Sequence, residues 1–188
     1  MRKRMLGIAW GLLAAATALW AAYGITGTRG LYTAGIAVSV TLYHFAMRLA
    51  VGAVIDRRCG NRLDGRGPGF QEKGWEAGLY RRLRVQNWKR HLPAFQPELF
   101  DLARHSLDEV IGAMCQAEVV HEIIMALSFA PLLLSLAVGD FPVFFITSLL
   151  AAVMDGLFVI LQRYNRPRLL QLRRRREERA RRNAREEA

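Results

Sequence analysis

Cysteine is scarce in this sequence, and its scarcity removes two classes of protein. Cys59 and Cys115 are the only two cysteines in 188 residues, and they lie far apart in the chain. A disulfide framework needs more cysteines, and a CxxC metal site needs a closely spaced pair. We therefore expect both to be free thiols that face a reducing compartment.

Three other patterns are also missing. The segment around His121 lacks the second histidine of an HExxH motif, so a zinc protease is disfavoured and we expect no metal. No aromatic or motif scaffold accompanies the arginine-rich C-terminal run, so we expect no nucleic acid as a partner. The chain shows no repeat symmetry, which disfavours a small transporter unless it oligomerises.

What the chain does contain is four long apolar runs. Each is long enough for an α-helix to cross the hydrocarbon core of a bilayer, which takes about 20 residues. The runs cover residues 6–23, 31–55, 119–138 and 141–161. The first follows a basic start and could also be read as a signal peptide, but a second run follows after a short turn, which favours a retained span. The predicted fold class is all-α integral membrane, with one four-helix domain over 1–172 and an Arg/Glu-rich tail over 173–188.

Basic residues predict how these spans are oriented. The net charge is +11, three basic residues precede the first run, eleven lie between Arg57 and Arg104, and eleven lie between Arg163 and Arg185. Cytoplasmic loops of membrane proteins carry an excess of lysine and arginine. We expect four spans across a bacterial cytoplasmic membrane, with both termini and the middle loop in the cytosol. All three basic groups then lie on the cytosolic side.

The middle loop carries a helical pattern of its own over residues 72–116. Between the second and third spans, Trp75, Leu79, Leu83 and Trp88 recur near helical spacing among arginines. This pattern is typical of an amphipathic helix in the headgroup region of a membrane. We expect it to end at Pro93 and Pro97, and a further helix from about Glu98 to run into the third span.

The first candidate site lies at the start of the third span. Glu118, His121 and Glu122 stand at positions i, i+3 and i+4, so they share one face of a helix. A carboxylate beside an imidazole orients it and raises its basicity, as a general base requires. The alternative is that these are only polar residues at a helix entrance.

The second candidate site lies inside the second span, at Tyr43, His44 and Arg48. An arginine at the centre of a bilayer costs roughly 2.5–3.5 kcal/mol on insertion scales, so it needs a partner. Asp155 in the fourth span and Glu118 are the two candidates. A purely structural ion pair is the alternative reading.

Two further candidate groups are rich in arginine or lysine. One follows the fourth span and contains Arg163, Tyr164, Asn165, Arg166 and Arg168. Guanidinium groups bind phosphate in bidentate fashion, although membrane anchoring would also explain them. Pro167 predicts that the span ends or breaks here. The other group, Trp88 and Lys89, is typical of an interfacial anchor.

Four segments together resemble a known family. They are QRYNRPRLLQL, the AExxH formed by Ala117, Glu118 and His121, LRVQNWKRHLP, and EKGWEAGLY. Over roughly Tyr43 to Leu172 the chain closely resembles the glycosyl-4,4'-diaponeurosporenoate acyltransferases, small membrane enzymes of staphyloxanthin-type carotenoid synthesis. The resemblance implies transfer of a fatty acyl group onto a sugar hydroxyl of a glycosylated carotenoid acid at the cytoplasmic membrane.

The candidate residues suggest how such a transfer would work. We expect His121, oriented by Glu118, to deprotonate the hydroxyl of a lipid-linked sugar. Arg163, Arg166 and Arg168, with Lys89, would hold the phosphates of an acyl-CoA or another acyl thioester, and no cofactor would stay bound. His44 and Arg48 would steady the acyl carbonyl or the developing oxyanion. A non-catalytic lipid or carotenoid binder, an accessory subunit and a small transporter are the alternatives, and an oligomer remains open.

Overall fold

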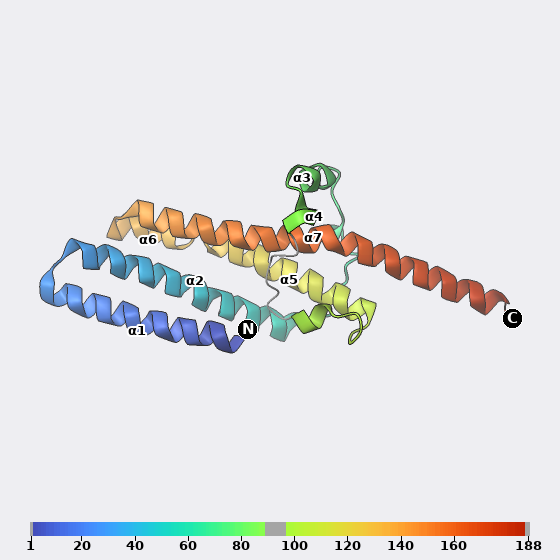
Figure 1. Cartoon of the computed structure of the whole chain (residues 1–188), viewed down its shortest axis with the longest axis horizontal. Coiled ribbons are helices and arrows are strands. Elements are labelled where there is room, and N and C mark those ends of the chain that lie inside the picture. Colours follow the sequence, from blue (N-terminus) through green and yellow to red (C-terminus); the bar gives the residue numbers. More distant parts are fainter. Residues whose placement is uncertain (1, 89–96, 187–188) are drawn as a thin grey trace. The chain divides into compact units, whose positions relative to one another are not determined.

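The computed structural model describes residues 2–88 and 97–186, and the regular structure in those residues is helical throughout, without strands. The main helices are α1 (Arg2–Thr26), α2 (Arg29–Cys59), α5 (Leu107–Leu127), α6 (Pro131–Val138) and α7 (Phe141–Glu186), as Figure 1 shows. Four helical stretches are long and apolar enough to span a membrane: Lys3–Thr26, Arg29–Cys59, Leu107–Val138 and Phe141–Glu186. The predicted all-α membrane fold with four spans is confirmed.

The chain divides into two compact units. The first unit comprises Met1–Ile55 and Val120–Leu157, and the second comprises Asp56–Val119 and Phe158–Ala188. We describe each unit by itself.

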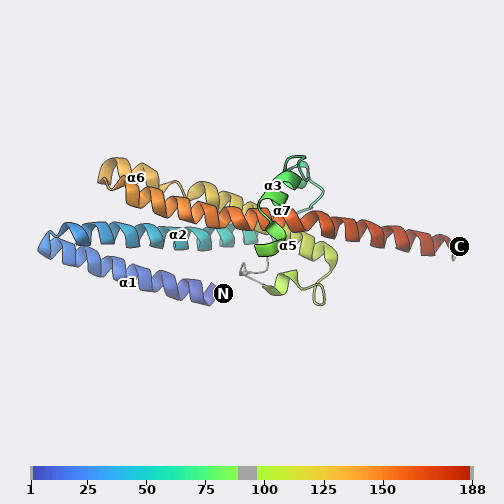
Figure 2. The ribbon, with the colours of Figure 1, turned by 45° about the horizontal axis from the view of Figure 1, so that its top comes forward.

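Helix packing in the first unit brings sequence-distant residues together. α1 and α2 run side by side in both views, joined by a short turn at Gly27, whose φ of +66° is a conformation that glycine adopts readily (Figures 1 and 2). The Trp20 indole donates to the Ser39 hydroxyl across this pair at 3.0 Å. Ile36 and Val40 of α2 pack on Phe144 of α7 in a buried cluster.

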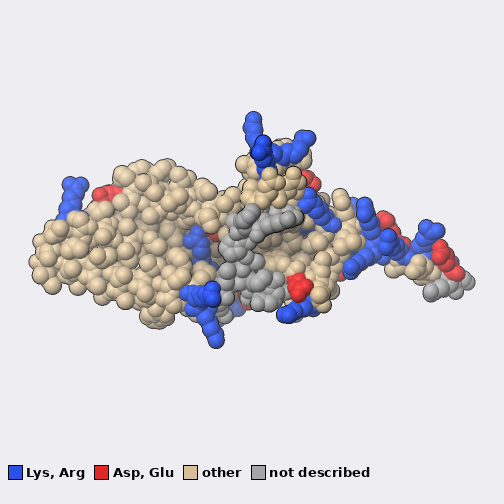
Figure 3. Space-filling view, in the orientation of Figure 1, with Lys and Arg blue, Asp and Glu red and all other residues tan. Residues whose placement is uncertain are grey.

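Large apolar side chains remain exposed on this unit, as expected of helices that face lipid. Trp10 is 69% exposed, Leu133 72% and Leu136 86%. On the face shown in Figure 3, uncharged residues make up most of the surface over α1, α2 and α6, with a few separate groups of Lys and Arg. A bilayer supplies the apolar environment that these side chains need.

The third span is broken rather than continuous. α5 ends at Leu127 and α6 begins at Pro131, because proline has no N–H to donate to the carbonyl four residues earlier. The Tyr43 hydroxyl of α2 donates to that carbonyl, Leu127 O, at 3.0 Å. At the other end of α6 the Tyr32 hydroxyl donates to Val138 O at 2.7 Å. Two tyrosines of α2 therefore hydrogen-bond to the backbone at both ends of α6.

The fourth span differs from our expectation. α7 continues through Pro167 to Glu186 instead of ending or breaking near Arg166. A proline inside a helix removes one hydrogen bond and disfavours helical backbone at the preceding residue. Arg166 is that residue, and it is 1% exposed and bound to Glu118, so tertiary contacts offset the local cost.

The interfacial segment of the second unit is more divided than predicted. It contains η1 (Pro68–Phe70), α3 (Glu76–Arg82), α4 (Val85–Trp88) and η3 (Pro97–Phe100), and α5 begins only at Leu107. Arg84, with a φ of +49°, separates α3 from α4. The long helix predicted from about Glu98 is therefore wrong before Leu107. Pro93 lies outside the described residues.

The aromatic stripe of this segment does not form the buried face. Trp75 is 62% exposed and Leu83 40%, whereas Glu76, Tyr80 and Val85 are buried. The tertiary core of the second unit therefore takes a neighbouring face of α3 and not the face that hydropathy marks. An exposed stripe of this kind remains available to a headgroup region.

A close backbone crossing holds the loop after α2 against α5. A Cβ built on Gly112 would lie 2.1 Å from the carbonyl oxygen of Asn61. The Asn61 N–H donates to Gln116 Oε1 at 2.7 Å, and Gln116 Nε2 donates to Asp56 Oδ1 at 3.2 Å. Only glycine permits this approach, because any Cβ would overlap the loop backbone.

Candidate active site

Within the first unit, a histidine, an aspartate and an arginine from three helices form a charged chain. His121 Nδ1 of α5 lies 2.9 Å from Asp155 Oδ1 of α7, and the other Asp155 oxygen accepts from Arg48 Nη2 of α2. The Asp155 side chain is 2% exposed, compared with 22% for His121 and 21% for Arg48. Both oxygens of the buried Asp155 carboxylate are therefore paired. Its partners, the His121 imidazole and the Arg48 guanidinium, remain partly exposed.

Arg48 is held by backbone as well. Its Nη1 donates to His44 O at 3.2 Å, and its Nη2 donates to Ala151 O at 3.3 Å. Of the two partners proposed for Arg48 from sequence, Asp155 is the one that it binds. The arginine is therefore fixed between α2 and α7, as an arginine inside a membrane requires.

His44 lies one helical turn before Arg48 and is 5% exposed. Its ring makes an edge-on contact with Tyr43 at 5.4 Å between centroids. Neither ring nitrogen has a hydrogen-bond partner among the residues that the structure describes. A buried imidazole without partners is uncommon, because desolvating a polar group costs stability.

The other predicted residues of this unit have different surroundings. Tyr43 bonds to the α5–α6 break through its hydroxyl, which gives it a structural contact. Glu122 lies on the exposed side of α5. Glu118, which we expected to orient His121, is not the carboxylate in this hydrogen bond: Asp155 is.

In the second unit, Glu118 instead belongs to a buried cluster of two acids and two arginines. Its Oε1 accepts from Arg163 Nη1 at 2.5 Å, and its Oε2 accepts from Arg166 Nη1. Glu76 of α3 accepts from Arg163 Nε at 2.8 Å. The four side chains are balanced in charge, which offsets the cost of burying each ion.

The same two arginines also hold η1 and the start of the loop that follows it. Arg163 donates to Gly69 O and to Gln71 O, both at 3.1 Å, and Arg166 donates to Phe70 O at 2.5 Å. The Arg163 guanidinium is therefore occupied by hydrogen bonds to protein acceptors, and its side chain is 11% exposed. An incoming phosphate would have to displace Glu76, Glu118 or the loop.

Tyr80 completes the buried side of α3. Its hydroxyl donates to Glu76 Oε2 at 2.9 Å, and its ring meets Tyr164 edge-on at 5.5 Å. Burial, followed by the hydrogen bond to the Glu76 carboxylate, raises the pKa of Tyr80 well above its ordinary value. The phenol therefore stays protonated and continues to donate to Glu76 at any physiological pH.

Arg168 differs from the two buried arginines because it is exposed. Its Nη2 donates to the Tyr164 hydroxyl at 2.6 Å, and its guanidinium carbon lies 4.1 Å from the centre of the Tyr164 ring. The tyrosine orients the guanidinium while leaving it open to solvent. Asn165, between them, is half-buried.

Trp88 and Lys89 end the list of predicted residues. The Trp88 indole N–H donates to Leu83 O at 2.9 Å, so it caps the end of α3. Lys89 lies outside the described residues. Among residues 2–88 and 97–186, no group of three or more His, Cys, Asp or Glu is placed to hold a metal ion.

Sequence reasoning missed three buried polar residues, of which two join the cluster around Arg163. Glu76 and Tyr80 stand four apart on α3, and this spacing was the available signal. Ser148, one turn beyond Phe144 on α7, is 0% exposed, and its hydroxyl is without a hydrogen-bond partner in the described chain. A lone serine in an apolar run gives no sequence signal.

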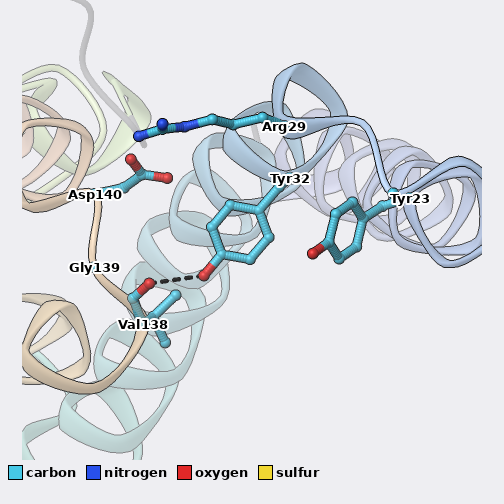
Figure 4. Close-up of a pocket in the computed structure, with 7 residues that line it drawn as sticks. Tyr23, Arg29, Tyr32, Val138, Gly139 and Asp140 are labelled. Carbon is cyan, nitrogen blue, oxygen red and sulfur yellow. Dashed lines mark hydrogen bonds between the residues drawn. The ribbon is translucent and has the colours of Figure 1, made fainter.

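A separate pocket of about 350 Å³ lies at the opposite end of the helices of the first unit. Figure 4 shows it beside the Tyr32–Val138 hydrogen bond, with Tyr23, Arg29 and Asp140 around it. Asp140 and Asp155 are separated by roughly 20 Å of α7 at 1.5 Å per residue. The pocket is therefore not part of the His121 cluster.

Comparison with known proteins shows which family the chain belongs to. A family model described as glycosyl-4,4'-diaponeurosporenoate acyltransferase matches residues 68–175, more than half of the chain. No curated protein and no solved structure matches. The matched range includes His121, Asp155 and the arginines of α7 up to Arg175, and it begins after His44 and Arg48, later than the resemblance had suggested. The chain is therefore a membrane protein that belongs to the glycosyl-4,4'-diaponeurosporenoate acyltransferase family, and it is an acyltransferase.

Proposed function

We propose that this protein transfers a fatty acyl group from an acyl thioester to a sugar hydroxyl of a glycosylated carotenoid acid or a related glycolipid, with His121 as the general base. The observation that carries the proposal is the 2.9 Å hydrogen bond between His121 Nδ1 and the buried Asp155 carboxylate. It joins a proton-accepting group to an orienting group inside a helix bundle of an acyltransferase family.

The hydrogen bond fixes which nitrogen would react. An ionised carboxylate accepts hydrogen bonds only, so the proton of a neutral His121 lies on Nδ1, facing Asp155. The Nε2 lone pair would then take the hydroxyl proton, as in other histidine bases that a carboxylate orients. The negative charge of Asp155 also stabilises the imidazolium that forms.

Arg48 has the supporting role of pairing with Asp155 and fixing its position. The Asp155 side chain is 2% exposed, and a buried charge needs a partner of opposite charge. The guanidinium of Arg48 is that partner, and the Ala151 carbonyl helps to fix it. Asp155, held in this way, orients the His121 imidazole.

The reaction balances with a thioester donor. The sugar oxygen attacks the carbonyl carbon, a C–O bond forms and the C–S bond breaks. The proton that His121 takes from the hydroxyl passes to the leaving thiolate, which departs as a thiol. Neither an oxidant nor a bound cofactor is required.

Arg168 is the described residue best suited to the phosphates of an acyl-CoA. It is exposed and pre-oriented on Tyr164, whereas Arg163 and Arg166 are held by carboxylates. Guanidinium groups bind phosphates strongly through paired hydrogen bonds. The role that we expected for Arg163, Arg166 and Arg168 together therefore passes to Arg168, with Lys89 as a second candidate.

The distribution of charge supports a donor that arrives from the cytosol. Twenty-five of the 27 basic residues precede the apolar run 6–23, lie between the runs 31–55 and 119–138, or follow the run 141–161. By the positive-inside rule these three regions would all lie in the cytosol of a bacterial cytoplasmic membrane. Cytosolic acyl thioesters would then reach the side of the membrane that carries Arg168.

The direct test is acyl transfer by purified protein. Wild-type protein in detergent would be incubated with radiolabelled palmitoyl-CoA and glycosyl-4,4'-diaponeurosporenoate, and lipid products separated. We expect labelled product from wild type and none from His121→Ala. His105→Ala is the matched control, since His105 pairs with Glu109 at the start of α5 and should keep full activity.

Two results would contradict the proposal. Full activity in His121→Ala would remove His121 from the reaction. Carotenoid or lipid binding without consumption of palmitoyl-CoA or of a palmitoyl-acyl carrier protein would instead indicate a binding or accessory protein. Using both donors in parallel identifies which thioester carrier the enzyme accepts.

A further inference from the structure

Two buried polar side chains of the first unit have no structural explanation. His44 of α2 is 5% exposed and Ser148 of α7 is 0% exposed. Neither ring nitrogen of His44 nor the Ser148 hydroxyl has a hydrogen-bond partner within residues 2–88 and 97–186. Buried polar groups are nearly always paired, so two unpaired ones in one unit point to a role other than packing.

Contacts on either side place both residues at the same level of the α2–α7 interface. One turn before them, Val40 of α2 packs against Phe144 of α7. One turn or so beyond them, Arg48 of α2 bonds to Ala151 and Asp155 of α7. Residues three or four apart in a helix lie on the same face, one above the other. His44 therefore lies between Val40 and Arg48 on α2, and Ser148 lies between Phe144 and Ala151 on α7.

At the level of His44 and Ser148 the helix interface changes from apolar to charged. On one side lies the apolar cluster of Ile36, Val40 and Phe144, and on the other lies the Arg48–Asp155–His121 chain. A fatty acyl thioester has a similar sequence of groups, with an apolar chain, then the carbonyl that is attacked, then the sulfur that leaves. The carbonyl would match the level of His44 and Ser148.

We infer that His44 and Ser148 receive the carbonyl oxygen of the transferred acyl group and stabilise the oxyanion that forms on it. This inference rests on the proposed function, and it adds two hydrogen-bond donors that the proposed function does not include. A neutral imidazole supplies one N–H and serine supplies one O–H, and both are donors to an anionic oxygen. Donors fixed in a site that excludes water act on the transition state without reorganising.

The step is the one already balanced for the transfer. When the sugar oxygen bonds to the carbonyl carbon, the C=O pair moves onto oxygen, where His44 and Ser148 donate to it. When the C–S bond breaks, the pair returns and the C=O bond reforms. Neither donor gives up its proton, so both are ready for the next cycle.

A structural role and an oxyanion role predict different values of kcat for Ser148→Ala. Removing an unpaired buried hydroxyl should leave thermal stability unchanged or raise it, whatever the function. If the hydroxyl serves only packing, activity also stays unchanged. If it binds the oxyanion, kcat should fall roughly 10²-fold, the usual effect of losing one such donor, with little change in KM.

The experiment measures kcat, KM and melting temperature for a set of full-length variants in detergent, with palmitoyl-CoA and glycosyl-4,4'-diaponeurosporenoate as probes. The set contains Ser148→Ala, Ser148→Thr and His44→Leu, with Thr147→Val as the matched control. Thr147 is the neighbouring hydroxyl, and it already donates to Val143 O at 2.7 Å. We expect Ser148→Thr and Thr147→Val to keep most of the wild-type kcat.

The possible outcomes separate this inference from the proposed function. Loss of kcat in Ser148→Ala and His44→Leu at unreduced melting temperature supports it. Activity within about twofold of wild type in Ser148→Ala, or a change confined to KM, overturns it. If His121→Ala is inactive while Ser148→Ala is active, only the oxyanion assignment fails; if His121→Ala is active, the proposed function itself fails. Should His44→Leu not fold, the Ser148 pair of variants decides the question.

Discussion

Asp155 of α7 is shared between His121 of α5 and Arg48 of α2, with its Oδ1 lying 2.9 Å from the imidazole Nδ1. The shared carboxylate predicts that Asp155→Asn lowers kcat strongly while the fold persists. The amide oxygen of asparagine still accepts from Arg48, but the amide no longer stabilises an imidazolium. General-base assistance contributes typically 10²–10⁴-fold, so we expect a loss of ~10²-fold or more in the acyl-transfer assay.

The matched control for that variant is Asp140→Asn. Asp140 begins the turn before α7 and accepts a hydrogen bond from Thr33 at 3.3 Å, far along the helix from Asp155. Its substitution should leave kcat unchanged. Equal activity of the two variants would show that Asp155 has no part in the reaction.

Arg166 and Arg168, two residues apart on α7, should respond differently to alanine. Arg166 is 1% exposed and pairs with Glu118, so its loss leaves a buried carboxylate with one partner fewer. Breaking a buried pair in this way costs about 3–5 kcal/mol, although Arg163 still bonds to Glu118 and will reduce the loss. Thermal unfolding in detergent should show a large drop for Arg166→Ala and almost none for Arg168→Ala. Similar melting temperatures would contradict the structural role of the buried cluster.

Arg168→Gln tests the phosphate contact. If Arg168 binds the donor, this variant should raise the KM for palmitoyl-CoA about tenfold, since 1.4 kcal/mol corresponds to a factor of ten, and leave kcat nearly unchanged. Arg179→Gln, farther along the exposed tail, is the control of equal charge change. An equal rise in KM for both variants would indicate general charge attraction and not a specific contact.

Gly112→Ala should destabilise the second unit. The new Cβ would lie 2.1 Å from Asn61 O, and the loop must move to make room. Forcing extra atoms into a close-packed site costs typically 1–3 kcal/mol. Gly52→Ala is the control, because a Cβ there meets no atom within 4 Å and should leave stability unchanged or improve it.

Tyr43→Phe separates a structural role from substrate binding. The hydroxyl bonds to Leu127 O at the α5–α6 break, so its loss should lower stability slightly, by about 0.6 kcal/mol, the average for hydrogen bonds between membrane helices. We expect kcat and KM to stay at wild-type values. A rise in KM for the carotenoid would return Tyr43 to the substrate-binding residues that sequence suggested.

Local pattern predicted the spans well because their signal is strong. About 20 apolar residues in sequence suffice to predict a membrane helix, and this held for all four stretches. Local rules failed at Pro167, where the helix continues, and in the segment before α5, where Arg84 divides the predicted helix. At Pro167 the buried contact of Arg166 with Glu118 outweighs a local preference of comparable size.

Sequence alone determined that the chain is a four-span membrane protein, that it resembles an acyltransferase family, and that Arg48 needs an acidic partner. Only the tertiary structure decided which acid meets which base: Asp155 with His121 and Arg48, and Glu118 with Arg163 and Arg166. The reason is physical. Hydropathy is a sum over neighbouring residues, whereas an ion pair depends on where separate helices bring two side chains together.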